Sequence, residues 1–285
     1  MKLRRPAFVK CSFAAALLFW SRAAAPHEYY LMPQDFTPPA GAAFGVEHRL
    51  GQDFKGNQIP YISRWTVRSE LRRGESSRTL KGTDGDRPAM SVPGLPASTV
   101  TLAYESNIDF LDFTEPAKLD AYLEKEGLTD VLALYRAGTL PPPSPEAPVK
   151  EAYARFARAL VHVGADKAGT DRPAALTAEL VAEANPLTLE PGAPLPVRFL
   201  WKGAPLAGIT VKVFPRQGAP YAERLVTDAQ GRVAVPDLGP GPYLLNAIRM
   251  GEPESAEAKE RGARWQSWWA SLTYVRVADE VRAAD

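Results

Sequence analysis

Closely spaced turn signals over residues 185–250 constrain the fold of this chain more than any other feature. Short apolar-alternating runs, such as Leu195, Val197 and Phe199, are separated there by turns that contain Gly and Pro. A period of two along such a run is typical of a β-strand with one apolar face. Several short strands in close succession predict an antiparallel β-sandwich.

A similar arrangement occurs near the beginning of the chain. Residues 33–44 resemble residues 186–195, because each stretch has a Pro-x-x-apolar-x-Pro turn, then a Gly, and then an alternating run. Further along, residues 92–94 (Val-Pro-Gly) echo residues 235–237 (Val-Pro-Asp), and a strand-like run follows each. Matches in the same order predict duplicated sandwiches, although Pro-x-Gly turns also recur in other β proteins.

The length of 285 residues is enough for two domains of ordinary size. We therefore expect a mainly β protein with an N-terminal β-sandwich over residues 26–185 and a C-terminal β-sandwich over residues 186–285. The last strand of the second sandwich is expected over Trp265–Val275, where its apolar residues anchor the edge of a sheet.

The hydrophobic period changes within the first predicted sandwich. Residues 114–160 predict an α-helical insertion of three short helices, of which the first ends at Gly127 and the second covers Asp130–Ala137. The third covers Lys150–Leu160 and has an apolar stripe at helical spacing, formed by Tyr153, Phe156, Ala157 and Leu160. Leu176–Ala182 then reads as the last strand of the first sandwich.

The first 25 residues have the pattern of a secretory signal peptide. A basic segment (residues 2–10) precedes a short apolar run (residues 11–20), and Ala23–Ala25 supplies small residues for cleavage. We therefore predict a secreted protein, and no other segment is long and apolar enough to span a membrane. The single cysteine, Cys11, lies in this segment, which excludes disulfides and thiolate chemistry from the mature chain.

The charge of the mature chain argues against a nucleic-acid partner. Five of the 34 Lys and Arg residues lie in the first 25 residues, which contain no acidic residue, so 29 basic and 33 acidic residues remain. A net charge of −4 lacks the basic excess that nucleic-acid binding uses.

The histidines are candidate metal ligands. The chain has three, His27, His48 and His162. If the first hairpin pairs Tyr29 with His48, then His27 and His48 share one face with Cβ atoms roughly 7 Å apart, and could hold nickel, cobalt or copper. In the alternative, His48 is a hydrogen-bonded core residue, because it alternates with apolar residues, and His27 lies at the surface. An amino-terminal copper or nickel chelate is blocked, because Pro26 has no N–H.

Three other groups have a functional and a structural interpretation. The aromatic residues Trp265, Trp268, Trp269 and Tyr274 could stack on sugars or a partner, but aromatic residues at sheet ends more often fill a core. Asp109, Asp112 and Glu115 could hold a hard cation, or could simply accompany a helix N-terminus. His162 lies between two valines and is expected to be structural.

Several stretches together are shared with one protein family. They are His27-Glu28-Tyr29-Tyr30-Leu31, residues 51–56 (GQDFKG), residues 122–128 (YLEKEGL), residues 153–160 (YARFARAL) and residues 269–273 (WASLT). The chain thereby resembles the NikM-like bacterial periplasmic proteins of unknown function, which are described as a periplasmic component of nickel/cobalt uptake. The resemblance covers nearly the whole mature chain and implies a role in metal handling.

Residues 204–249 are also similar to the transthyretin-like or Cna-B-like module. The shared features are Ala204-Pro205-Leu206-Ala207-Gly208, Thr227-Asp228 and Gly231. The resemblance implies that the sandwiches are of immunoglobulin or transthyretin type.

Two functional hypotheses follow. The first is a periplasmic binding or accessory protein for nickel, cobalt or another divalent transition metal, which holds the ion through His27 and His48 and works with a membrane transport system or outer-membrane receptor. The alternative is a metal-free envelope interaction module for a protein or polysaccharide. We do not expect an enzyme, because the chain has no Gly-x-Ser-x-Gly, His-Glu-x-x-His or Gly-rich phosphate-loop motif.

Overall fold

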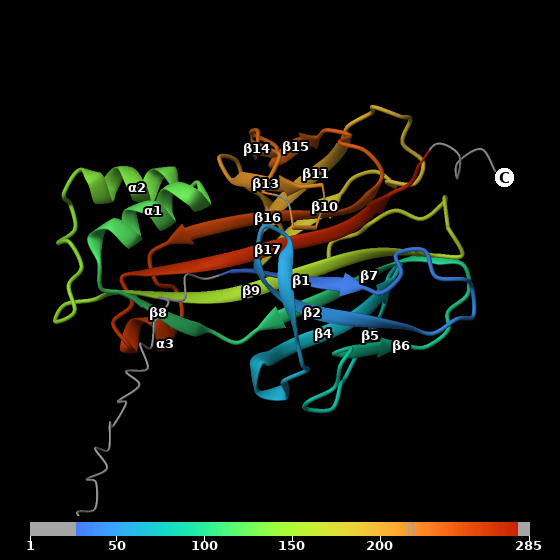
Figure 1. Cartoon of the computed structure of the whole chain (residues 1–285), viewed down its shortest axis with the longest axis horizontal. Coiled ribbons are helices and arrows are strands. Elements are labelled where there is room, and N and C mark those ends of the chain that lie inside the picture. The colour runs from blue at the N-terminus through green and yellow to red at the C-terminus, as the bar shows by residue number, and fades with distance from the viewer. Residues whose placement is uncertain (1–26, 216, 219, 279–285) are drawn as a thin grey trace, which may run out of the picture.

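Three β-sheets form most of this protein. The computed structural model describes residues 27–215, 217–218 and 220–278. A nine-stranded central sheet lies between two four-stranded sheets that cover its opposite faces (Figure 1). The expected fold class, mainly β with few helices, is confirmed. The predicted signal peptide over residues 1–25 lies outside the described residues.

The central sheet has the strand order β14-β13-β16-β17-β9-β7-β4-β5, with β8 also paired to β9. Its strands are β4 (Thr66–Arg73), β5 (Ser76–Thr79), β7 (Ser98–Ser106), β8 (Asp109–Phe113), β9 (Val149–Val163), β13 (Thr210–Phe214), β14 (Glu223–Val226), β16 (Gly241–Gly251) and β17 (Trp265–Arg276). A short 3-10 helix, η1 (Ser63–Trp65), precedes β4.

The two small sheets have the same plan. The N-terminal small sheet contains β1 (Glu28–Pro33), β2 (Phe44–Gln52), β3 (Lys55–Ile59) and β6 (Met90–Val92). The C-terminal small sheet contains β10 (Ala178–Ala182), β11 (Leu195–Trp201), β12 (Ala204–Pro205) and β15 (Arg232–Val235). In each, the second strand pairs with the first on one edge and with the other two on its opposite edge.

The strand pairing reproduces the repeat seen in the sequence. Phe44 lies opposite Val92 in the N-terminal small sheet, and Leu195 lies opposite Val235 in the C-terminal one. The order β5-β4-β7-β9 on one side of the central sheet likewise matches β14-β13-β16-β17 on the other. Each repeat therefore supplies one small sheet and half of the central sheet.

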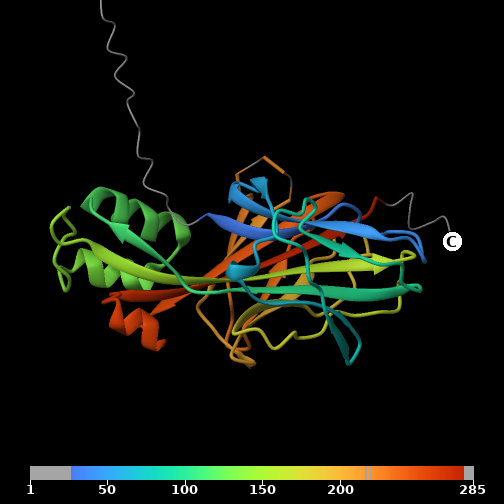
Figure 2. The same cartoon turned by 90° about the horizontal axis from the view of Figure 1, so that it is seen from below.

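The two sandwiches are joined through a parallel strand pair. Strands β9 and β17 run side by side, from Glu151 opposite Trp265 to Ala159 opposite Thr273 (Figure 2). The expected boundary between residues 185 and 186 falls inside the C-terminal small sheet, because β10 pairs with β11. Strand β10 therefore belongs to the second sandwich, and the first sandwich ends with β9.

The central strands are buried on both faces. Leu102 of β7 and Ala157 of β9 pack toward the N-terminal small sheet, whereas Ala103 and Phe156, their neighbours in sequence, pack toward the C-terminal small sheet. A fully buried Leu or Phe side chain contributes about 1.5–3 kcal/mol to the free energy of unfolding relative to an exposed one. Burial on both faces is clearest in β9, in which all residues except Lys150 and Arg155 are buried.

Two of the three predicted helices are present. Helix α1 (Pro116–Glu126) ends at Gly127, whose φ of 71° is left-handed, and α2 (Thr129–Arg136) follows directly. The third prediction is wrong, since residues 150–160 belong to strand β9. Its apolar residues follow a helical period, but they lie on both faces of a strand whose two faces are buried, and pairing with β7 and β17 decides the outcome.

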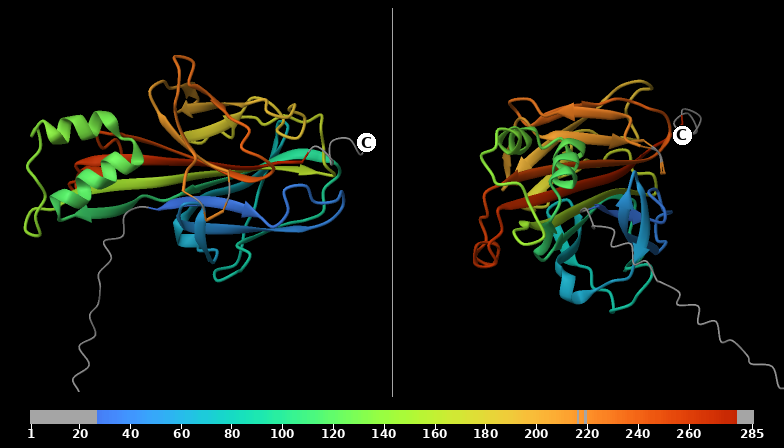
Figure 3. Two further views of the ribbon diagram at one scale, coloured as in Figure 1. Left: turned by 45° about the horizontal axis from the view of Figure 1, so that its top comes forward. Right: turned by 60° about the vertical axis from the view of Figure 1, so that its left-hand side comes forward.

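The helices cover one end of the central sheet. Figure 3 shows α1 and α2 beside the ends of β9, β16 and β17 that extend past the small sheets. Trp265 and Trp269 of β17 are buried beneath this helical pair, and Trp268 and Tyr274 are buried on the opposite face, so the structural interpretation of this aromatic cluster is confirmed. Strand β17 lies in the middle of the sheet and not at its edge as expected.

A third helix, α3 (Ala256–Glu260), lies between β16 and β17. Within the described part of the chain, none of the helices has the length and apolar character that crossing a bilayer requires.

Candidate functional site

A break in the central sheet lies beside a pocket. Strand β7 pairs with β9 up to Glu105 opposite Phe156, and β8 resumes the pairing at Asp109 opposite Tyr153. Three residues on one side (Ser106–Ile108) thus face two on the other (Ala154 and Arg155), as in a β-bulge. Such irregularities redirect side chains and often occur at functional sites.

The pocket at this break has a volume of about 190 Å³. Its lining includes Leu50 and Ile59 of the N-terminal small sheet and four aromatic residues, which are Tyr29, Trp65, Tyr104 and Tyr153. Tyr29 and Tyr104 stack on each other with ring centroids 4.9 Å apart. Trp65 is 41% exposed and forms the rim. The pocket therefore offers flat apolar surfaces with one side open to solvent.

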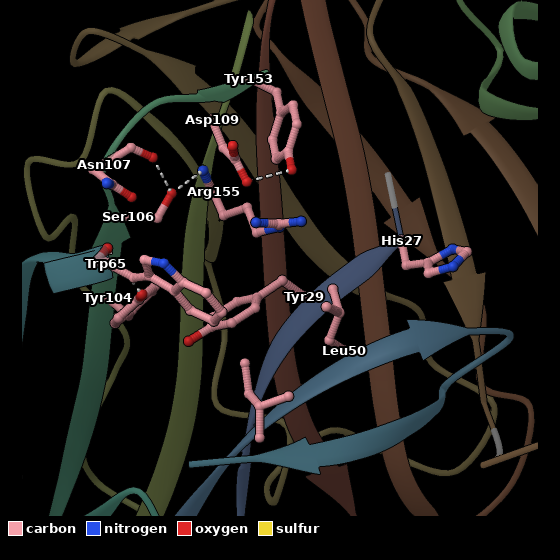
Figure 4. Close-up of a pocket in the computed structure, with 11 residues that line it drawn as sticks. His27, Tyr29, Leu50, Trp65, Tyr104, Ser106, Asn107, Asp109, Tyr153 and Arg155 are labelled. Atoms are coloured by element: carbon pink, nitrogen blue, oxygen red, sulfur yellow. Dashed lines mark hydrogen bonds between the residues drawn. The ribbon is translucent and has the colours of Figure 1, made fainter. Parts of the chain in front are cut away.

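Arg155 is the cation of the pocket. Its guanidinium lies 4.7 Å from the ring centroid of Tyr153 and 5.8 Å from that of Tyr29, and Figure 4 shows it between these two rings. Among the described residues, no carboxylate forms an ion pair with it. An arginine held over aromatic faces without a carboxylate partner is free to bind an anion or another planar acceptor.

Ser106 and Asp109 of the pocket are engaged in hydrogen bonds, whereas the Tyr29 hydroxyl has no partner among the residues described. The Ser106 hydroxyl accepts a hydrogen bond from the Arg155 backbone N–H at 2.9 Å and donates one to the Asn107 carbonyl at 2.7 Å. Asp109 accepts hydrogen bonds from the Tyr153 hydroxyl at 2.8 Å and from the Phe110 N–H at 2.9 Å. These bonds hold Tyr153 and the bulge in place around Arg155 (Figure 4).

The corresponding end of the second sandwich is filled. In the N-terminal small sheet, Leu50 of β2 lies opposite Tyr29 of β1. The equivalent position in the C-terminal small sheet is Trp201 of β11, which lies opposite Ala178 of β10. The Trp201 ring packs at 4.6 Å against Trp268, and the Arg249 guanidinium lies 4.1 Å and 5.0 Å from the centroids of these two rings. Strand β16 is also unbroken along β17. The pocket thus distinguishes the first sandwich from the second.

His48 is a buried core residue. It is 2% exposed, and its ring packs edge-on against Tyr104 at 4.8 Å and Tyr29 at 5.6 Å. Burial lowers the pKa of His48 to about 4, so the ring is neutral at physiological pH. Its Nε2 has no hydrogen-bond partner in the described part of the chain, so the predicted hydrogen bond of a core histidine is not seen at this atom. The counterpart position in the second sandwich is Phe199, which is also buried in a core.

His27 lies at the other side of the pocket. It is half-buried, and burial lowers its pKa, with smaller contributions from the positive charges of Lys125 and Arg155. In Figure 4 its ring points away from the aromatic wall. Its Nδ1 is buried without a hydrogen-bond partner among the residues described.

The structure does not bring His27 and His48 together. The hairpin pairs His48 with Leu31 and not with Tyr29, so the register differs by two residues from the one expected. His27 precedes β1 and lies four residues before Leu31, the residue that pairs with His48. Four residues of extended chain correspond to roughly 13 Å between the two histidines along the strand direction. Tyr29 occupies the face between them and contacts His48. The described residues contain no group of three or more His, Cys, Asp or Glu able to hold a metal ion.

A family model described as "Domain of unknown function (DUF4198)" matches residues 24–251. The chain belongs to the DUF4198 family. No curated protein matches the sequence. DUF4198 membership thus establishes the family and leaves the activity open.

Among solved structures, this DUF4198 chain is similar to one titled "Human OSCAR ligand-binding domain". The identity is 13%, the match covers 89% of this chain and 100% of the other, and the TM-score is 0.21. A TM-score of this size supports no conclusion about function.

The remaining candidates of the DUF4198 chain do not form a site. Asp112 is exposed on β8, and Glu115 precedes α1 and pairs with Lys118 at 2.5 Å, so neither joins Asp109 in the pocket. His162 is fully buried, and its Nδ1 lies 3.0 Å from the Thr99 hydroxyl, which agrees with a structural role.

Sequence reasoning missed Arg155 and Tyr153 of the DUF4198 pocket. Both lie in the segment that was interpreted as the third helix, and only the pairing of β9 with β7 and β8 aligns them with Tyr29. The sequence signal that could have located the pocket is the interruption of the strand pattern at Asn107, between two runs that pair with the same strand.

Proposed function

We propose that this protein is a periplasmic binding protein that holds a small organic molecule in the pocket of the first sandwich and does not transform it. The observation that carries the proposal is Arg155, which lies between aromatic rings in an open pocket without a carboxylate partner. The equivalent end of the second sandwich is filled by Trp201, Trp268 and Arg249, which supports a specific use for the open one.

Binding without catalysis agrees with how the pocket's polar groups are used. A nucleophilic serine needs a base within hydrogen-bond reach. Ser106 instead accepts from one backbone group and donates to another, and it is not paired with His27. Ser106 and Asp109 therefore position the pocket, and Arg155, the Tyr29 hydroxyl and His27 Nδ1 are left to meet the ligand.

The metal-handling role that the NikM-like resemblance implies stays a prediction. The two histidines do not form a shared site in this structure, so the residues do not fit one ion held by both. Titration of the purified protein with nickel, cobalt and copper, beside His27→Ala and His48→Ala, tests any role of each histidine separately. A membrane transport system or outer-membrane receptor remains the partner to which a bound molecule would be delivered.

The pocket proposal is tested by filling the pocket. Leu50→Trp copies the residue that occupies the counterpart position in the second sandwich, and Trp201→Leu is the matched control. Ligand-observed NMR measures the binding of four single-ring probes: benzoate, benzamide, benzylamine and phenol. We expect at least one probe to bind the wild-type protein and the control, and none to bind Leu50→Trp. The proposal is contradicted if no probe binds the wild-type protein, or if Leu50→Trp folds and binds them unchanged.

A further inference from the structure

We propose that the pocket selects a single-ring monocarboxylate, with the carboxylate on Arg155 and the ring against Trp65. This inference rests on the proposed binding function and names the chemical class of the ligand. It follows from the geometry of Arg155, from the charges that surround it, from the size of the pocket and from the exposure of Trp65.

Arg155 is oriented for a planar anion. A guanidinium presents parallel N–H groups that match the two oxygens of a carboxylate, and such paired hydrogen bonds are stronger than neutral ones. The rings of Tyr153 and Tyr29, at 4.7 Å and 5.8 Å, restrict the guanidinium to one region of the pocket. An arginine that is held in place loses less conformational entropy when a ligand binds.

The surrounding charges favour one negative charge on the ligand. Burial lowers the pKa of His27 most, the positive charges of Lys125 and Arg155 lower it further, and the Glu126 carboxylate raises it, so two cations and one anion act at this end of the pocket. Asp109 is the pocket's one carboxylate among the residues described, and both of its oxygens accept hydrogen bonds. A second acidic group on the ligand would be repelled by Asp109, which favours a monocarboxylate over a diacid.

The volume of the pocket limits the ligand to one ring. An apolar cavity of about 150 Å³ is sufficient for benzene. The pocket has about 190 Å³, so one six-membered ring with a short acidic substituent fills it. A larger ligand would extend past the rim into solvent.

Trp65 provides the surface for the ring. In the described part of the chain it is one of four exposed large apolar residues, at 41%, and the nearby Val67 is 63% exposed. Aromatic rings stack face to face with an offset or meet edge to face, and such contacts add to the gain from burial. A ligand ring on Trp65 would cover apolar surface that is otherwise in contact with water.

The test compares the charge of otherwise similar rings. Ligand-observed NMR at pH 7.5 gives the dissociation constants of benzoate, neutral benzamide and cationic benzylamine for the wild-type protein. We expect benzoate to bind at least tenfold more tightly than either analogue. Arg155→Gln is expected to weaken benzoate binding by about tenfold to a hundredfold and to change benzamide binding little.

Arg249→Gln is the matched control, because Arg249 also lies over two aromatic rings but in the filled end of the second sandwich. It should bind benzoate as the wild-type protein does. Arg155→Lys, which keeps the charge without the planar fork, should bind benzoate with intermediate affinity. The comparison of the three probes on the wild-type protein decides the question even if the Arg155 variants do not fold.

The outcomes separate the ligand class from the binding function. If benzamide or benzylamine binds as tightly as benzoate, and Leu50→Trp abolishes that binding, the carboxylate class is wrong and the binding function stands. If benzoate is preferred but Arg155→Gln folds and keeps the preference, Arg155 is not the recognising group and the inference is overturned. If none of the probes binds, both the inference and the proposed function are contradicted.

Discussion

At the scale of single residues, His48 makes stability depend on pH. Burial lowers its pKa from 6.5 to about 4, so the unfolded chain binds more protons than the folded one between these values. The stabilisation of the folded protein by neutral His48 is therefore fully present above pH 6.5 and is lost as the pH falls toward 4.

Replacing His48 by Phe, the residue at the counterpart position in the second sandwich, should remove this dependence. We expect the wild-type protein to lose about 2 kcal/mol more than His48→Phe in its free energy of unfolding between pH 7 and pH 5. Urea unfolding at both pH values measures the difference, and the equally buried His162 contributes the same amount to both proteins. Equal losses in the two proteins would show that His48 is not buried as a neutral ring.

Glu151 has the opposite effect. It is fully buried, its Oε1 accepts a hydrogen bond from Tyr122 at 3.0 Å, and burial raises its pKa to about 7. The folded protein thus binds more protons than the unfolded chain between pH 4.5 and 7, and stability falls as the pH rises through this window.

Glu151→Gln keeps the shape and the acceptor and removes the charge. Relative to the wild-type protein, its free energy of unfolding should increase by about 2–3 kcal/mol between pH 5 and pH 8. Urea unfolding across this range checks the trend. A difference that stays constant with pH would mean that Glu151 is ionised in the folded protein at pH 5.

At the scale of elements, a buried ion pair attaches α1 to the sheet. Lys212 of β13 contacts Glu126 at the end of α1 at 2.5 Å and Glu28 of β1 at 3.3 Å, and all three side chains are at most 5% exposed. Gly127 follows, and a Cβ at this position would lie 2.8 Å from the Thr210 side chain. The end of α1 is thereby fixed against β13.

Removing Lys212 should be costly. Lys212→Met leaves two buried carboxylates without a cation, and we expect a loss of about 3–5 kcal/mol in the free energy of unfolding. Adding Glu126→Gln should restore part of it. Lys118→Met, which removes the exposed pair with Glu115, is the control and should have little effect. Similar losses for Lys212→Met and Lys118→Met in chemical unfolding would contradict a buried ion pair.

How far the elements can be predicted from the sequence depends on local pattern. Strands β2 and β11 alternate cleanly and are bounded by turns, so their existence follows from the residues alone. Strand β9 does not, because Tyr153, Phe156, Ala157 and Leu160 also fit a helix. Its partners β7 and β17 are distant in sequence, and pairing between distant segments leaves no local signal. The pocket depends on this pairing, so Arg155 could not be found from the sequence.

At the scale of the whole molecule, the repeat was visible in sequence but the way its two copies join was not. The turns at residues 33–44 and 186–195 identify two similar units. The parallel pairing of β9 with β17 turns them into one continuous sheet, and the core beneath the C-terminal small sheet contains residues that a division at residue 185 would separate.

The shared sheet predicts that the two sandwiches unfold together. Breaking the contact between β9 and β17 would expose strands that are buried on both faces, so neither half should be stable while the other is unfolded. Differential scanning calorimetry should show one transition whose calorimetric and van't Hoff enthalpies agree. Two separate transitions would mean that the halves behave as independent domains.

The central claim is that the open pocket beside Arg155 binds a single-ring carboxylate. The most direct measurement follows the tryptophan indole N–H signals by NMR while benzoate is added to the purified protein. The signal of Trp65 should shift progressively, while those of Trp201 and Trp268 in the filled end of the second sandwich stay in place. An unchanged Trp65 signal, or equal shifts of all three, would contradict the claim.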